Sequence, residues 1–199
     1  MDTFAFAGHD TTAMGLTWIV YLLGRNKDVQ KKVYDEVDQI FGGGAPVNRD
    51  NLKKLHYMDR CLKEASRLYG SVPFFGRITS QECEIAGFVV PRDMNLMVCT
   101  YNVHRNPRIW KNPEKFDPDR FSKENSAGRH PFAHVPFSAG ARNCIGQRFA
   151  VQEEKALLLL LVKNFDFTSH DAPEDIEMIG EMILRPKAPL NISFKKRIC

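Results

Sequence analysis

The feature that most constrains this chain is a glycine-punctuated loop with one cysteine, from Phe137 to Gly146. Arg142 lies two residues before Cys144, and the run from Gln147 to Lys163 directly after the loop predicts a long helix. A thiolate near a helix N-terminus and a guanidinium is stabilised in its charged form by the helix dipole and the neighbouring cation. The loop is therefore suited to supply an anionic sulfur ligand to a metal.

The residues around the cysteine favour a flat partner for that metal. Gly140 and Gly146 let the backbone pass close to a macrocycle and let amide groups turn toward the sulfur, and Phe137 can pack against a macrocycle face. The pattern predicts a haem-thiolate loop with Cys144 as the axial iron ligand. Two alternatives stay open for the cysteine: a buried structural residue, or a nucleophile, for which nothing marks His134 as its base.

Composition limits the class of protein. With 199 residues, 43% of them hydrophobic, the chain has room for one domain with a substantial core, which we place at residues 1–199. The formal charge of +4 without a long basic run argues against a nucleic-acid partner. Five scattered cysteines without a C-x-x-C pair favour a reducing compartment. The longest aliphatic run, Ala156 to Val162, is far below the ~20 residues that cross a bilayer, so we expect no membrane anchor here.

The run from Phe4 to Leu23 predicts a helix that is apolar almost all round and therefore buried. Its Ala-Gly-His-Asp-Thr-Thr segment, residues 7–12, suits a regular helix poorly, because Asp and Thr compete for backbone hydrogen bonds and Gly costs ~1 kcal/mol against Ala. One interpretation is a helix start with Asp10 or Thr11 as the N-cap. The other is a functional site within a longer helix.

The rest of the chain predicts a mainly α fold with small β-sheets, of the α+β class. Apolar residues at helical spacing and turn signals predict further helices at Asn26–Phe41, Asn48–Leu55 and Tyr57–Tyr69, and we expect Asn48 to cap the second of these. Short alternating runs predict strands at Phe75–Thr79, Glu84–Ile85, Phe88–Val90, Leu96–Thr100, Phe165–Thr168, Ile183–Arg185 and Leu190–Phe194. We expect a polar surface loop at Ser122–Arg129.

The helix at residues 57–69 carries Glu64 and Arg67 three positions apart on one face. Such pairs are usually exposed and stabilise a helix by only ~0.2–0.5 kcal/mol, so the pair alone is a weak signal. It gains weight from the Pro-Asp-Arg-Phe segment that contains Arg120, before the cysteine loop. His104 is a candidate partner for these charges or for an anionic ligand, and a capping or packing histidine is equally compatible with the sequence.

Four segments, taken in chain order, resemble the motifs of the cytochrome P450 family. They are Ala-Gly-x-Asp-Thr-Thr, Glu-x-x-Arg, Pro-x-Arg-Phe and Phe-x-x-Gly-x-Arg-x-Cys-x-Gly. The segment Gly-His-Asp-Thr-Thr-Ala-Met-Gly, residues 8–15, resembles the corresponding segment of family 4, whose members hydroxylate fatty-acid chains. The resemblance covers the whole chain, while the chain covers only the C-terminal, haem-binding part of the family's fold. We therefore expect Met1 to lie inside a long helix of a larger protein.

The resemblance implies a role for each motif. Asp10 and Thr11 would be the acid–alcohol pair that delivers protons to dioxygen, beside a helix opened at Ala7 and Gly8. The remaining site residues would bind or support haem. Those roles are iron ligation by Cys144, propionate contacts from Arg77 and Arg142, packing and close approach at Phe137, Gly140 and Gly146, and a buried Glu64–Arg67–Arg120 network beneath the loop.

The resemblance also implies a cofactor and partners. We expect haem b held without a covalent bond, because Ala7 stands where many family 4 members carry a glutamate esterified to haem. Electrons would come from NADPH through a separate cytochrome P450 reductase, with cytochrome b5 as a second candidate partner, and the parent protein would face the cytosol on the endoplasmic reticulum membrane. The leading function is a monooxygenase acting on a lipophilic substrate. The alternatives are a haem-thiolate isomerase or dehydratase, which would not need the acid–alcohol pair, and an inactive truncated product or reductase-interacting module.

Overall fold

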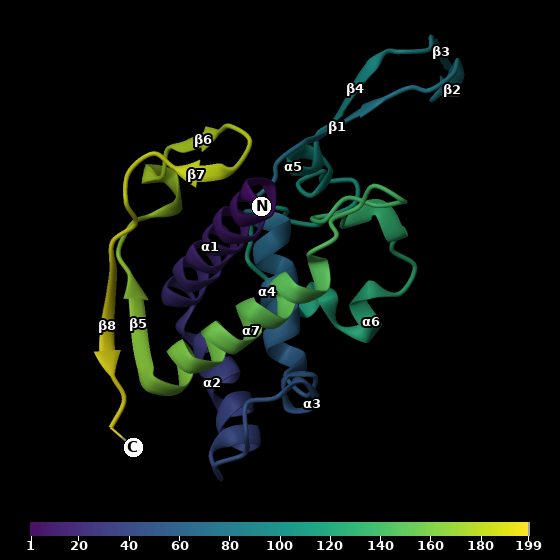
Figure 1. The fold of residues 1–199 in the computed structure, drawn as a ribbon. Helices are drawn as coiled ribbons and strands as arrows, with labels where there is room; N and C mark the ends of the chain where they lie inside the picture. Colours follow the sequence, from purple (N-terminus) through teal and green to yellow (C-terminus); the bar gives the residue numbers. More distant parts are fainter. Residues whose placement is uncertain (199) are drawn as a thin grey trace.

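The computed structural model describes residues 1–198 and contains long helices packed with small two-stranded sheets (Figure 1). Cys199 lies outside the described residues. The α-helices are α1 (Asp2–Arg25), α2 (Lys27–Phe41), α3 (Arg49–Leu52), α4 (His56–Leu68), α5 (Thr100–Val103), α6 (Lys123–Ser126) and α7 (Gln147–Asn164). The 3-10 helices are η1 (Pro118–Phe121), η2 (Pro131–Ala133) and η3 (Pro173–Asp175). This mixture of helices and small sheets confirms the predicted α+β class.

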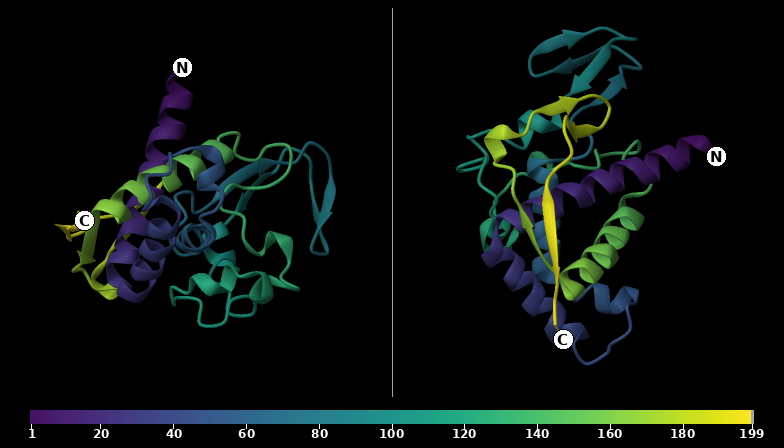
Figure 2. Two further views of the ribbon diagram at one scale, coloured as in Figure 1. Left: turned by 90° about the horizontal axis from the view of Figure 1, so that it is seen from below. Right: turned by 90° about the vertical axis from the view of Figure 1, so that its left-hand side faces the viewer.

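The strands pair only as antiparallel neighbours within the described residues. The pairs are β1 (Phe75–Ile78) with β4 (Asn95–Val98), β2 (Cys83–Ile85) with β3 (Phe88–Val90), β5 (Phe165–Ser169) with β8 (Ile192–Lys196), and β6 (Met178–Gly180) with β7 (Leu184–Pro186). The first two pairs form an arm that extends away from the helices (Figures 1 and 2). The β5–β8 pair instead packs against α1.

Local sequence explains where the helices of the body begin and end. In α2, Val29, Val33 and Val37 form a buried stripe at i, i+4 and i+8, while the other face is exposed. Asn48 accepts a hydrogen bond from the amide of Asn51 and so caps α3, as the sequence predicts.

None of the helices within residues 1–198 combines the length and the hydropathy that crossing a membrane requires.

The hydrophobic core lies among the C-terminal half of α1, α2, α4, α7 and β5. Trp18 of α1 is fully buried and stacks on Tyr69 with ring centroids 4.3 Å apart. Its indole N–H donates to the carbonyl of Leu184, 3.3 Å away, and the amide of Leu184 donates to the carbonyl of Ser71. The C-terminal β6–β7 hairpin is therefore held against both α1 and the end of α4.

Helix α1 differs from two expectations. It is continuous through residues 7–12, so Asp10 and Thr11 are not N-caps and the helix is not opened at Ala7 and Gly8. The Thr11 hydroxyl donates to the Ala7 carbonyl at 2.6 Å, which satisfies the hydroxyl inside a regular helix.

The first half of α1 is also exposed rather than buried. Phe4 and Phe6 are 70% and 50% exposed, whereas Trp18 to Leu23 is buried. Apolar composition predicts that a helix prefers burial, but burial also needs a packed neighbour, and within residues 1–198 α2, α4 and β5 pack chiefly on the C-terminal half.

Several segments contain more secondary structure than the sequence predicts, among them α5, which begins at Thr100 where a strand was expected, and the 3-10 helices. The expected polar loop at residues 122–129 holds the one-turn helix α6, which is capped by the Ser122 hydroxyl. Strand β6 is also absent from the predicted set, because three residues with one half-buried side chain give no readable alternation.

Candidate functional site

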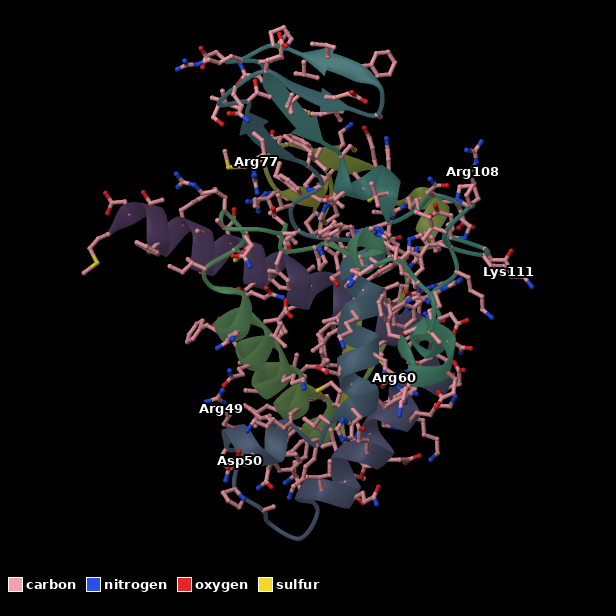
Figure 3. All side chains as sticks on the ribbon, turned by 90° about the vertical axis from the view of Figure 1, so that its right-hand side faces the viewer. Arg49, Asp50, Arg60, Arg77, Arg108 and Lys111 are labelled. Atoms are coloured by element: carbon pink, nitrogen blue, oxygen red, sulfur yellow. The ribbon has the colours of Figure 1, made fainter. Side chains whose placement is uncertain are left out.

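A cavity of about 840 Å³ lies between α1, α4, α7 and the cysteine loop. The N-terminal halves of α1 and α7 both contribute lining residues. The lining includes Thr11 from α1 and Cys144 and Phe137 from the loop. Arg77, at the base of the arm, also lines the cavity (Figure 3). The sequence motifs at residues 7–12 and 137–146 thus meet at one cavity.

The cysteine loop is a tight turn that ends at the N-terminus of α7. The amide of Cys144 donates to the carbonyl of Phe137 at 3.0 Å, and Ser138 and Gly140 have φ values of +61° and +81°. The positive φ at Gly140 explains why glycine suits this position. Cys144 is a free, exposed thiol that lines the cavity, three residues before α7 begins at Gln147.

Two arginines lie together at the cavity rim. The Arg77 guanidinium donates to the Ser138 hydroxyl at 2.7 Å and to the backbone carbonyl of Arg142 at 3.3 Å, and it lies over the Phe75 ring. Arg77 therefore joins the arm to the cysteine loop. Both arginines line the cavity, which gives it a cationic rim suited to carboxylate groups.

The structure separates the two polar residues of α1 that the sequence singles out. Thr11 lines the cavity, whereas Asp10 is not among the lining residues. The Asp10 carboxylate forms an ion pair with the guanidinium of Arg185 on β7. The hydroxyl is therefore at the cavity wall, and the acid is held at the C-terminal hairpin.

A buried charged network lies behind the loop. Glu64 and Arg67 are fully buried, and the Arg67 guanidinium donates to both Glu64 carboxylate oxygens at 2.7 and 2.9 Å. Arg120 donates to the same carboxylate at 3.2 Å, and the amide of Asp117 adds a further hydrogen bond at 3.0 Å. The structure thus brings Glu64, Arg67 and Arg120 together, with every Glu64 oxygen partnered.

His104 is part of the surroundings of this network and does not line the cavity. It is 2% exposed, its carbonyl accepts from Arg67, and its Nε2 accepts from the amide of Val135. Of the roles that the sequence leaves open, the contacts favour the network partner over a ligand of an anionic group.

Glu154 is a lining residue with a carboxyl group that no sequence motif indicates. Glu154 of α7 lies against Gly15 of α1, where a Cβ added to the glycine would come within 2.5 Å of the Glu154 carboxyl oxygen. Burial, and then the neighbouring Glu153, raises the pKa of the Glu154 carboxyl to about 7. Its sequence signal is only the acidic pair of Glu153 and Glu154, which stands between Gln152 and Lys155 in α7.

The residues present fit a haem group. Within residues 1–198, no three His, Cys, Asp or Glu side chains converge to hold a bare metal ion. A single thiolate suffices for haem iron, because the macrocycle supplies the equatorial nitrogens. A Cβ added at Gly8 would meet nothing within 4 Å, and one at Gly146 would meet only the Cys144 sulfur, at 3.9 Å, so space for a flat group remains on both sides.

Comparison with known proteins identifies the family. The family model described as Cytochrome P450 matches residues 1–194. The chain is 48% identical over 198 residues to "Cytochrome P450 4V2" of Rattus norvegicus and to the Homo sapiens protein of that name, and 44% identical over 199 residues to "Cytochrome P450 4c3" of Drosophila melanogaster. In each case 99% of this chain is covered, and the chain spans 38%, 38% and 37% of those relatives. The motifs, the fold and these matches agree that the chain belongs to the cytochrome P450 family.

Proposed function

We propose that the protein represented by this chain is a haem-thiolate monooxygenase that inserts one oxygen atom of O₂ into an apolar C–H bond of a lipophilic substrate. The observation that carries the proposal is that the exposed Cys144 thiol and the Thr11 segment line the same cavity. Names of relatives in family 4 add support for the enzyme class. Fatty-acid hydroxylation is the finer proposal, and it rests on the resemblance of residues 8–15 to that family.

The proximal residues would bind and orient the cofactor. Cys144, which lies just before the N-terminus of α7, would ligate the iron as a thiolate. Arg77 and Arg142 would hold the haem propionates at the cationic rim, and Phe137 would pack against the macrocycle. Haem, when bound, supplies the dioxygen chemistry. Because Ala7 offers no carboxylate, the cofactor would be haem b held without a covalent bond.

The distal residues would handle protons. The Thr11 hydroxyl is oriented by the Ala7 carbonyl, to which it donates at 2.6 Å. Its oxygen remains free to accept or pass a proton at the cavity wall. Asp10 would be the acid that supplies protons from the outer side of α1, where it forms an ion pair with Arg185. This division assigns proton storage to Asp10 and proton delivery to Thr11.

The partners follow from the chemistry. Monooxygenation consumes two electrons, which we propose come from NADPH through a separate reductase, with cytochrome b5 as a second donor. The parent protein would act at the endoplasmic reticulum membrane, facing the cytosol.

The test is a carbon-monoxide difference spectrum of the chain after addition of haem and reduction by dithionite, beside Cys144→Ser. A thiolate ligand is expected to give a strongly red-shifted Soret band that the serine variant lacks. Haem that remains bound through gel filtration, together with that band, would justify a substrate screen with reductase. The absence of the band in the natural sequence would contradict haem-thiolate binding by this chain and favour a non-catalytic module.

A further inference from the structure

We propose that His104 is a positioning residue for Cys144, and that its ring connects the buried charged network to the first residues of the cysteine loop. The inference rests on the proposed function only in taking Cys144 as the haem ligand. Its structural part concerns contacts that this chain makes without haem.

His104 makes two hydrogen bonds in opposite directions. Its backbone carbonyl accepts from Nη1 of Arg67 at 2.8 Å, and its ring Nε2 accepts from the amide of Val135 at 2.9 Å. Arg67 is fixed in turn by both oxygens of Glu64. The rigid, fully buried network thus reaches Val135 through a single residue.

Val135 is a favourable point from which to orient the loop. The next residue, Pro136, has no amide hydrogen and a fixed φ, so the Val135 amide is the last backbone donor before Phe137. The carbonyl of Val135 accepts from the amide of Ser138 at 3.1 Å, and the carbonyl of Phe137 accepts from the amide of Cys144 at 3.0 Å. A fixed Val135 therefore restricts both hydrogen bonds that close the loop.

The surroundings of His104 keep its ring an acceptor. Arg67 of α4 and Arg105 after α5 lie near the ring, and the His134 ring lies beside it with centroids 5.2 Å apart. Burial, followed by these two arginines, lowers the pKa of His104 to about 4. At neutral pH the ring is uncharged, with Nδ1 protonated and the Nε2 lone pair directed at the Val135 amide.

A packing histidine would behave differently from a positioning one. Leucine fills a similar volume, but it would leave the half-buried Val135 amide without an acceptor. Glutamine can place its side-chain oxygen near the position of Nε2 and so restore the acceptor without a ring. Comparison of His104→Leu with His104→Gln therefore separates the effect of losing the hydrogen-bond acceptor from the effect of losing the ring.

The first experiment is residue-resolved amide hydrogen exchange on the haem-free chain. We expect His104→Leu to speed exchange of the Val135 and Cys144 amides roughly tenfold, and His104→Gln to keep both near the natural rate. Amides of α2, which does not contact this loop, should be unchanged. The matched control is His170→Leu, since His170 is an exposed histidine that bonds the Ser193 hydroxyl far from the loop.

The second measurement is the position of the reduced, carbon-monoxide-bound Soret band after haem is added. We expect a smaller fraction of thiolate-type haem in His104→Leu, restored in His104→Gln and unaffected in His170→Leu. If the natural sequence binds no haem, the proposed function fails, while the exchange experiment still decides the role of His104. Unchanged Cys144 exchange in His104→Leu, or equal acceleration throughout the chain, would overturn the proposal.

If His104→Leu does not fold, His104→Asn replaces it, because the shorter amide keeps polarity but does not reach the Val135 amide. Faster exchange at Val135 and Cys144 in that variant supports the proposal. Natural exchange rates at both amides contradict it.

Discussion

The two sides of the cavity are held in very different ways. The cysteine loop is supported by the Glu64–Arg67 pair, which is fully buried, and by His104 and Arg77 at its ends. The opposite wall, the first half of α1, has exposed phenylalanines and is tied to the rest of the chain by an ion pair whose side chains are 17% and 40% exposed.

The difference shows which wall of the cavity is held in a single arrangement. Buried charges with every oxygen and donor partnered allow only one arrangement, because any other would leave a charge unpaired away from water. A partly exposed ion pair exchanges protein contacts for water at little cost. The chain by itself thus fixes the register of Cys144 strongly, and the position of Asp10 weakly.

The largest effect should come from the network behind the loop. Glu64→Gln removes the negative charge between Arg67 and Arg120, and we expect it to destabilise the chain by about 3–5 kcal/mol. Urea denaturation followed by circular dichroism measures this. The matched control, Glu177→Gln, breaks an exposed pair with Lys187 and should change stability by less than about 0.5 kcal/mol. Similar effects in the two variants would remove the contrast between buried and exposed charges.

A smaller, pH-dependent effect on the unfolding free energy is expected at Glu154, where α7 contacts α1. Its pKa is raised from 4.5 to about 7 in the folded chain, so the native state keeps a proton that the unfolded state releases over this range. Stability from this group is full below pH 4.5 and is lost as the pH rises to about 7. The total is at most about 3 kcal/mol.

Glu154→Gln should remove this dependence. The difference in unfolding free energy between the variant and the natural sequence should therefore grow in favour of the variant from pH 4.5 to 7. Parallel stability profiles would show that the Glu154 carboxyl is not protonated at the α1–α7 contact. Glu153→Gln is the neighbouring control.

The distal ion pair should contribute less. A double-mutant cycle with Asp10→Asn and Arg185→Gln is expected to give a coupling free energy of about 1 kcal/mol or less, because Arg185 is 40% exposed. The coupling should weaken in high salt, and the same is expected of the exposed pair of Lys187 with Glu177. A coupling as large as that of the Glu64 network would mean that the two sides are equally well fixed.

The smallest effect on stability should come from the exposed start of α1. Phe4→Ser and Phe6→Ser remove apolar surface that already faces solvent, so the unfolding free energy should change by less than about 0.5 kcal/mol. Self-association, measured by sedimentation velocity, should fall because exposed aromatic side chains favour contacts between molecules. A large loss of stability would show that these side chains are packed in solution.

The sequence by itself determined much of the local structure and the position of the cysteine loop before α7. Helical spacing and cap residues placed α2 and α4 within one residue of their observed starts, and the Asn48 cap of α3 was predicted from its side chain. Turn chemistry and the helix after it marked the Cys144 loop, because a positive φ at Gly140 and a cysteine just before a helix follow from local sequence.

Only the tertiary structure decided burial and partners. Asp10 and Arg185 are 175 positions apart, and no local pattern links them. Apolar composition predicted a buried α1, yet neighbours cover only its second half, and Glu154 has a raised pKa because α1 crosses α7 at a glycine. Periodicity and turns act over a few residues, whereas burial and ion pairing depend on which distant segments pack together.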